Sequence, residues 1–207
     1  MDTHSNNQVT VVGHLASGYT FSHESHEEKF YSCTLAIERT SGTKDYLPII
    51  VSEKLIGTKN TYDDELICVI GQIRSYNQQA NDKRHLLLYL FAFEFYPTDS
   101  EYMNEVCVEG YVCKEPTYRV TPYGRKISDL IIAIPRCYGK SDYIPFVCWG
   151  RNAVFASQLE VGQCVSLSGR MQSREYQKCI NDVNVTKIAY EVSVNKINIM
   201  DRDIQYA

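Results

Sequence analysis

The chain has 207 residues and a formal net charge of −4 at pH 7. This length suits one large domain or two small ones, and the acidic balance means that an anionic partner must be met by local clusters of Lys and Arg. No apolar run reaches the roughly 18 residues that cross a bilayer. The opening residues MDTHSNNQ lack the regions of a signal peptide, so we expect a cytoplasmic protein.

Eight cysteines and five histidines are scattered along the chain without a Cys-x-x-Cys pair or another metal-ligand spacing. Most of the cysteines lie inside apolar, strand-like runs, where thiols pack as small hydrophobic groups. We therefore expect reduced cysteines in a reducing compartment. The sequence predicts no metal site and no cofactor.

Short runs of β-branched and aromatic residues, separated by Gly, Pro, Asn and Ser, predict strands along the first half of the chain. These runs are residues 9–15, 30–39, 46–52, 66–73 and 86–95. The stretch EKLIGTKNTYDDEL between the third and fourth runs has room for a helix or a loop.

The second half repeats this set of strands, with RNAVFASQL between its third and fourth runs. Its runs are residues 104–112, 127–136, 143–150, 164–171 and 183–194. Five strands with an insertion after the third is the order of an OB-fold, a partly open five-stranded barrel. We predict an all-β protein of two tandem OB-fold barrels, one in residues 1–97 and one in residues 103–200.

An internal repeat supports this division, because many matching residues are separated by one constant shift of 97 positions. The matched pairs include Gly13 with Gly110, Arg39 with Arg136, Asp45-Tyr46 with Asp142-Tyr143, and Pro48 with Pro145. Gly71 and Gly169 follow at a shift of 98. The repeated Asp-Tyr-aliphatic-Pro stretch indicates duplicated barrel architecture.

The third run of the second copy carries the only tryptophan of the chain. Side chains alternate along a strand, so Tyr143, Pro145, Val147 and Trp149 share one face, and Ile144, Phe146 and Cys148 share the other. The second face suits a core. The first puts an aromatic ring at each end, where bases of a nucleic acid strand can stack, although aromatic residues in strands also serve as packing.

Further aromatic and cationic residues are interleaved around this run in the sequence. The candidates for contact with a single strand are Tyr118, Arg125, Lys126, Arg136, Tyr138, Lys140, Arg151, Arg170, Arg174 and Tyr176. Such cations would neutralise phosphates and make binding salt-dependent.

Residues 104–177 resemble the OB domain of the bacterial single-stranded DNA-binding protein family. The resemblance is carried by Asn104, Val106 and Gly110, by PTYRVTPYG at 116–124, and by the segments 142–150, 153–159 and 169–176. It implies non-catalytic, sequence-tolerant binding of single-stranded DNA in replication, recombination or repair. It also implies that Tyr138, Tyr143, Trp149 and Tyr176 stack on bases, and that a homodimer supplies four barrels.

Two departures limit what the resemblance implies. The sequence ends VNKINIMDRDIQYA, without the acidic tip through which family members recruit replication and repair enzymes, so that recruitment is not expected here. In the first copy, Ser41 and Ser52 stand at the positions of Tyr138 and Trp149, and Tyr46, Arg74 and Tyr76 are the remaining candidates. We expect this copy to be structural or to bind weakly.

An OB-fold module for protein interaction or assembly, with weak or no DNA binding, is the alternative, because Tyr, Trp and Arg are also frequent hot spots of protein interfaces. An enzyme is not indicated. The sequence contains no P-loop, no nucleophile elbow and no His-Glu-x-x-His motif.

Overall fold

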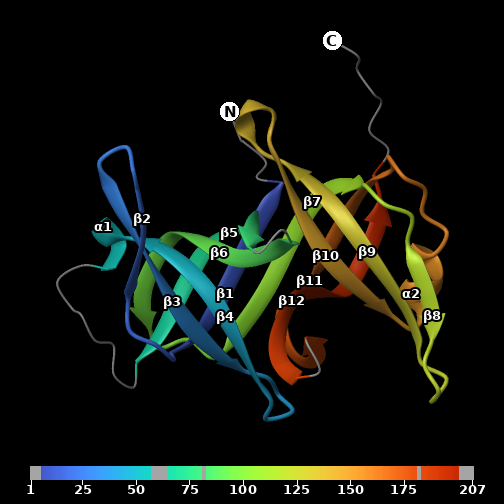
Figure 1. Ribbon diagram of the computed structural model, residues 1–207, viewed down its shortest axis with the longest axis horizontal. Coiled ribbons are helices and arrows are strands. Elements are labelled where there is room, and N and C mark those ends of the chain that lie inside the picture. Colours follow the sequence, from blue (N-terminus) through green and yellow to red (C-terminus); the bar gives the residue numbers. More distant parts are fainter. Residues whose placement is uncertain (1–5, 57–64, 81–82, 181–182, 201–207) are drawn as a thin grey trace. The chain divides into compact units, whose positions relative to one another are not determined.

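The chain folds into two compact units built almost entirely from β-strands (Figure 1). The computed structural model describes residues 6–56, 65–80, 83–180 and 183–200. The described parts of Val9–Glu105 and Met171–Glu191 form one unit, and those of Met1–Gln8, Val106–Arg170 and Val192–Ala207 form the other. The division into residues 1–97 and 103–200 stays a prediction. No helix in the described ranges has the length and apolar character to cross a membrane.

Five strands of the first repeat close into a barrel. The elements are β1 (Asn7–Leu15), β2 (Thr20–Ser25), β3 (Glu28–Glu38), β4 (Lys44–Ser52), α1 (Glu53–Ile56), β5 (Leu66–Ala80) and β6 (Lys83–Thr98). β1 pairs with β3 and β5, β3 pairs with β4, β4 runs parallel to β6, and β6 returns to β5. This closed order is that of an OB-fold, and β2 extends β3 into a hairpin.

The second repeat closes in the same order. Its elements are β7 (Met103–Val112), β8 (Thr117–Val120), β9 (Lys126–Pro135), a 3-10 turn (Cys137–Gly139), β10 (Ser141–Trp149), α2 (Arg151–Ala156), β11 (Cys164–Ile180) and β12 (Val183–Ile199). β7 pairs with β9 and β11, β9 pairs with β10, β10 runs parallel to β12, and β11 lies beside β12. The predicted all-β fold of two OB barrels is confirmed.

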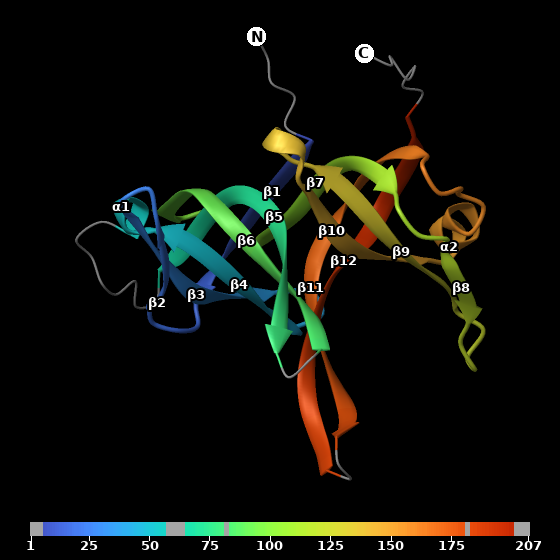
Figure 2. The same ribbon diagram turned by 45° about the horizontal axis from the view of Figure 1, so that its top comes forward.

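The predicted insertions begin with α1 and α2, and residues 57–64 lie outside the described residues. The fourth and fifth strands of the first repeat are longer than predicted, because β5 continues to Ala80 and pairs with β6 as a two-stranded hairpin beyond the barrel wall (Figure 2). The polar stretch RSYNQQA gave no apolar signal for a strand. Its backbone is paired by β6 instead.

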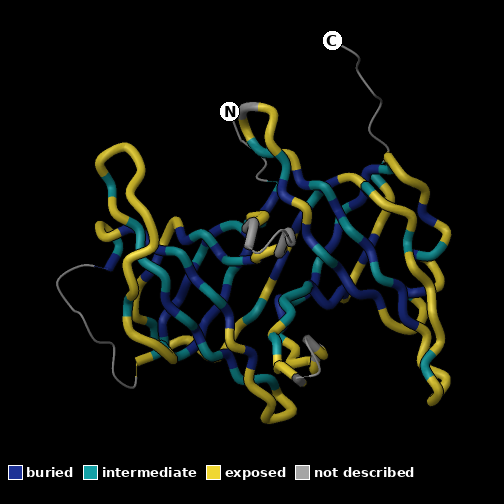
Figure 3. The backbone as a smooth tube through the Cα atoms, in the orientation of Figure 1, coloured by how far each residue is buried: buried dark blue, intermediate teal, exposed yellow. Residues whose placement is uncertain are grey.

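Each barrel encloses its own core of aliphatic side chains. Figure 3 marks the buried residues along the backbone of the strands. In the first barrel Leu35, Leu47 and Ile49 are 0% exposed, and in the second Ile132 and Ile144 are 0% exposed. These residues alternate with half-buried or exposed neighbours along their strands. Burial with a period of two is the pattern of a strand that forms a barrel wall.

The repeated glycines lie where two strands approach closely. A Cβ atom on Gly71 would lie 2.0 Å from the carbonyl oxygen of Phe91, and one on Gly169 would lie 2.1 Å from that of Ser193. Both distances are far below van der Waals contact with a backbone atom that cannot move aside. The glycine of the fourth strand is therefore required by the barrel in both copies.

The repeated Arg and Asp form a buried ion pair in each barrel. Arg39 Nε and Nη2 donate to Asp45 Oδ2 and Oδ1, each at 2.6 Å, and Arg136 makes the same two-pronged contact with Asp142. Both carboxylates are 0% exposed. The hydrogen bond to Asp45 raises the pKa of Arg39, although burial opposes this. Bidentate, charge-assisted contacts of this kind are strong. The repeated Asp therefore has a structural role in each barrel.

All eight cysteines are free thiols. Cys33, Cys68, Cys148 and Cys164 are buried. Burial raises the pKa of Cys33 and of Cys148 to about 12, so these two thiols stay protonated at neutral pH and behave as small core residues.

We expect Asp142→Asn to lower the free energy of unfolding by about 3 kcal/mol, because it leaves the Arg136 guanidinium, 27% exposed, without its counter-charge. Urea denaturation measures the loss. Asp129→Asn is the matched control, since Asp129 and Arg119 are 43% and 52% exposed and their pair is worth about 0–1 kcal/mol. Equal losses in the two variants would contradict the assignment.

We expect Gly169→Ala to destabilise the protein by about 1–3 kcal/mol or to prevent folding, because the added methyl group must displace backbone. Gly18→Ala is the control, since a Cβ atom there meets nothing within 4 Å and surface changes of this kind stay within about 0.5 kcal/mol. Thermal unfolding followed by circular dichroism compares the two. A Gly169→Ala protein as stable as the parent would refute the close approach.

Candidate nucleic-acid interface

Strand β10 presents an aromatic ring at each end of its outer face. Tyr143 is 46% exposed and Trp149 is 41% exposed. On the inner face Ile144, Phe146 and Cys148 are at most 1% exposed, as their alternation predicts. Val147 shares the outer face with the two rings, but it lies between β9 and β12 and is only 3% exposed.

Trp149 is the end of a row of side chains that crosses three strands. It lies opposite Ile127 on β9, and Ile127 lies opposite Arg119 on β8. Residues that face each other in this way share one face of a sheet. Arg119 Nε also donates to Asp129 Oδ2 at 3.1 Å, and this hydrogen bond holds the arginine in its place at the other end of the row.

Tyr143 belongs to a second row that the sequence did not reveal. Tyr143 lies opposite Ala133 on β9, and Ala133 lies opposite Tyr111 on β7. Tyr111 is 38% exposed, and the two rings flank a small residue on one face, about 10 Å apart for two strand spacings. The outward phase of β7 was available from the sequence, but the pairing that brings Tyr111 level with Tyr143 was not.

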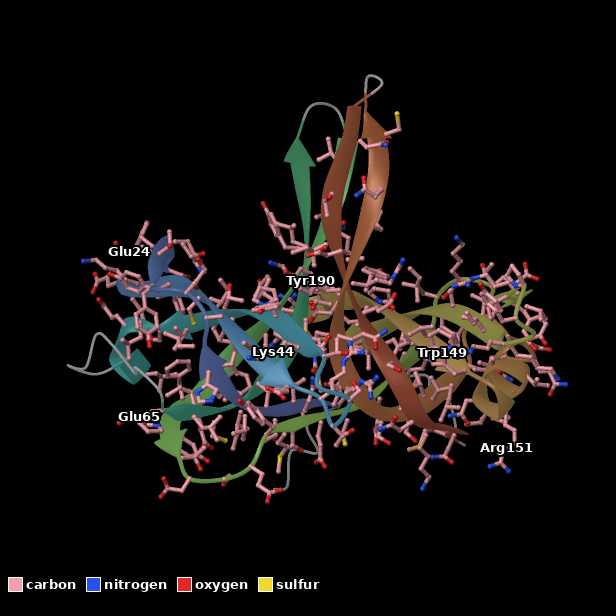
Figure 4. The ribbon with its side chains drawn as sticks, turned by 90° about the horizontal axis from the view of Figure 1, so that it is seen from below. Glu24, Lys44, Glu65, Trp149, Arg151 and Tyr190 are labelled. Atoms are coloured by element: carbon pink, nitrogen blue, oxygen red, sulfur yellow. The ribbon has the colours of Figure 1, made fainter. Side chains whose placement is uncertain are left out.

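The candidate cations of this unit fall into two groups. Arg136 is held by the buried Asp142, and Arg170 is half-buried with its Nε atom enclosed and without a hydrogen-bond partner in the described part of the chain. The others are exposed and form no ion pair with a described carboxylate. They are Arg125, Lys126, Lys140 and Arg151, and Arg151 projects away from the barrel wall (Figure 4).

Two predicted aromatic residues are not brought into these rows. Tyr118 is 41% exposed, but it lies opposite Ser128 and therefore on the other face of β8 from Arg119. The backbone of Tyr138 forms part of the 3-10 turn, and its side chain lies outside the described residues.

The other unit contains the remaining candidates. Tyr176 on β11 is 36% exposed, and Arg174 Nε lies 3.9 Å from Glu191 Oε1. Tyr46 and Tyr76 are 46% and 58% exposed. Arg74 lies opposite Tyr89 on β6 and donates through Nη2 to Gln72 Oε1.

At the Trp149 position of the first copy, Ser52 is 6% exposed and donates to Glu28 Oε1. Glu28 also accepts from Lys54 Nζ at 2.8 Å. The hydrogen bonds from Lys54 and Ser52 lower the pKa of Glu28, so the carboxylate is ionised at neutral pH. A buried serine offers no ring on which a base could stack.

Among the described residues, no group of three or more His, Cys, Asp and Glu side chains is arranged to hold a metal ion.

Comparison with known proteins identifies relatives of this chain. A profile of the single-strand binding protein family matches residues 103–200. The single-stranded DNA-binding protein of Clostridium tetani is 33% identical over 82 residues, covering 36% of this chain and 57% of that protein. Single-stranded DNA-binding protein B of Bacillus subtilis is 28% identical over 105 residues, covering 47% of this chain and 90% of that protein.

The fold of the whole chain also has a known counterpart. The crystal structure of wild-type single-stranded DNA binding protein from Thermus aquaticus matches 97% of this chain and 96% of that chain, with a TM-score of 0.75 at 18% sequence identity. At that identity the likeness concerns the fold. The chain spans about half the length of several curated relatives, 57% for Clostridium tetani and 48% for Bacillus cereus. Residues 103–200 are thus similar to the single-strand binding protein family.

Proposed function

We propose that this chain binds single-stranded DNA without sequence preference and without catalysis, in replication, recombination or repair. Bases stack on Tyr143 and Trp149 of β10, whose separation of six residues corresponds to about 20 Å along a strand. Tyr111 and Tyr176 are further stacking residues. Stacking on an aromatic ring is tolerant of sequence, because every base has a π-face.

The observation that carries this proposal is a contrast between three matched positions of the two copies. Arg125, Trp149 and Arg151 stand in the second copy where Glu28, Ser52 and Lys54 stand in the first. Glu28, Ser52 and Lys54 are bound to one another.

The second copy instead keeps an exposed ring and two arginines that form no ion pair with a described carboxylate. Unpaired cations beside an exposed ring suit a phosphate backbone with bases.

Arg125, Lys126, Lys140 and Arg151 are the phosphate contacts in this proposal. The charges of the two halves support the choice of the second copy: residues 1–97 hold eight Lys or Arg and twelve Asp or Glu, whereas residues 98–207 hold thirteen of each. Arg136 acts indirectly, since its ion pair with Asp142 fixes the start of β10.

Titration with oligo-dT at low salt should quench the fluorescence of the single tryptophan, Trp149. We expect Tyr143→Ala and Tyr176→Ala each to weaken binding by about 1–3 kcal/mol, the contribution of one stacked base. Trp149→Ala should have the same effect, measured by anisotropy of labelled oligo-dT. Tyr96→Ala is the control, because Tyr96 is 41% exposed on β6 of the other unit and is not among the proposed contacts.

Raising the salt concentration should weaken binding in the parent and in all four variants. No quenching and no anisotropy change, even at low salt, would overturn the proposal and leave the alternative of a protein-interaction module.

A homodimer that supplies four barrels, in the cytoplasm, completes the proposed function. The free thiols of all eight cysteines support a reducing compartment. Sedimentation equilibrium should give twice the 23.8 kDa mass of the chain. A mass of one chain at micromolar concentration would refute the dimer without affecting the assignment of the stacking residues.

A further inference from the structure

The first barrel carries a connected group of aromatic rings on its outside. The ring of His23 stacks on Phe30 with centroids 4.9 Å apart and planes 10° from parallel. Phe30 lies 5.5 Å from Phe91, and Phe91 lies 5.8 Å from Phe93, measured between centroids. We call His23, Phe30, Phe91 and Phe93 the Phe91 cluster.

The strand pairing places the residues of this cluster on the outer side of the barrel wall. Phe30 lies between His23 of β2 and Ser52 of β4, and Phe91 lies beside Ile50 of β4. Phe93 is the extra residue of a bulge in β6, where the pairing shifts between Ile70 and Gly71. A bulge redirects a side chain, and Phe93 is 49% exposed. His23 is also exposed, whereas Phe30 and Phe91 are half-buried.

Most residues of the cluster are not aromatic at the matching positions of the second copy. The constant shift places Ile127 at the position of Phe30, Ile188 at that of Phe91, and Tyr190 at that of Phe93. Of these three, only Tyr190 is aromatic, so the second copy lacks the rings of Phe30 and Phe91. Packing of the barrel alone does not require the rings of Phe30 and Phe91, because the second barrel closes with isoleucine at both positions.

Two exposed carboxylates, Glu53 and Glu94, lie next to residues of the Phe91 cluster. Glu53 is exposed and its Oε1 accepts from the backbone N–H of Lys29, the residue before Phe30. Glu94 follows the bulge residue Phe93 and is exposed. Glu24 lies opposite Lys29 on the hairpin of β2 and β3 (Figure 4), and Lys54 is paired with Glu28, so these two cations already face carboxylates.

This negative rim is unfavourable for a phosphate backbone, because like charges repel. Exposed rings inside a charged rim are instead typical of a protein interface, where aromatic residues provide the buried centre and charges guide the partner.

We propose that the Phe91 cluster is a docking surface for a segment of another protein in which apolar side chains alternate with Lys or Arg. The apolar side chains cover Phe91 and Phe93, and the cations meet Glu53 and Glu94. The acidic rim carries this choice of partner, because complementary charge selects a basic segment over an acidic one.

The probe is a short fluorescein-labelled peptide of alternating Lys and Leu, and the control peptide has Glu in place of Lys. Anisotropy should show saturable binding of the Lys peptide only, weakened by salt. We expect about tenfold weaker binding for Phe91→Ser with Phe93→Ser, as for removal of hot-spot rings. Glu53→Lys with Glu94→Lys should give a similar loss while keeping the rings. Tyr123→Ser is the control variant, because Tyr123 is 92% exposed in the other unit.

Three results would overturn the proposal. The first is equal binding of both peptides, or no binding, by the parent. The second is an oligo-dT affinity that falls in Phe91→Ser with Phe93→Ser, which would make the cluster a nucleic-acid platform. The third is a halved mass for that variant in sedimentation, which would make it an interface between copies of this chain.

Circular dichroism melting confirms that each variant is folded, and the charge variant tests the proposal independently if the Ser variant is not. Because the peptide assay contains no DNA, its outcome is independent of whether the parent binds oligo-dT.

Discussion

The buried carboxylate at the start of the third strand fixes which side chains the barrel presents to solvent. Asp142 is fully enclosed and held by Arg136, so it must point inward. Because side chains alternate, Tyr143 and Trp149 must then point outward. A slip of one residue would expose Ile144 and Phe146 and bury both rings with Asp142 outside. Arg39 and Asp45 impose the same phase on the first barrel.

This constraint leaves the outer face free to differ between the copies. At the end of the third strand the second copy has Trp149, and the first has the buried Ser52. The first copy places Phe30 next to that serine on the neighbouring strand and extends the rings to β6 through Phe91. The two copies of the barrel thus carry aromatic surfaces that differ in position and in the charge around them. For this reason we assign them different partners.

The repeat made much of this structure predictable. Matching strands, the phase of β10 and the structural role of the Asp-Tyr-aliphatic-Pro stretch all follow from alternation and from the constant shift. Arg136 shows that residue type alone is not enough to assign a role: its ion pair with Asp142 is signalled by Arg39, which stands six residues before Asp45 as Arg136 does before Asp142. The position of Tyr111 level with Tyr143 depends on the pairing of β7 with β9, and the Phe91 cluster depends on the pairing of β4 with β6. Neither pairing can be read from a local sequence pattern.

The charges beside the end of the third strand differ more between the two copies than the net charges of the copies do. In the first copy Glu28 sits at the position of Arg125, so the cation at the position of Arg151, Lys54, is neutralised within the barrel surface. Exchanging one arginine for glutamate therefore removes two positive charges from the surface that a phosphate would meet. It also provides an acceptor for the serine that replaces the tryptophan. Under the proposed function, the absence of stacking and of phosphate contact in the first copy is thus one coupled difference, centred on a single carboxylate beside the end of the third strand.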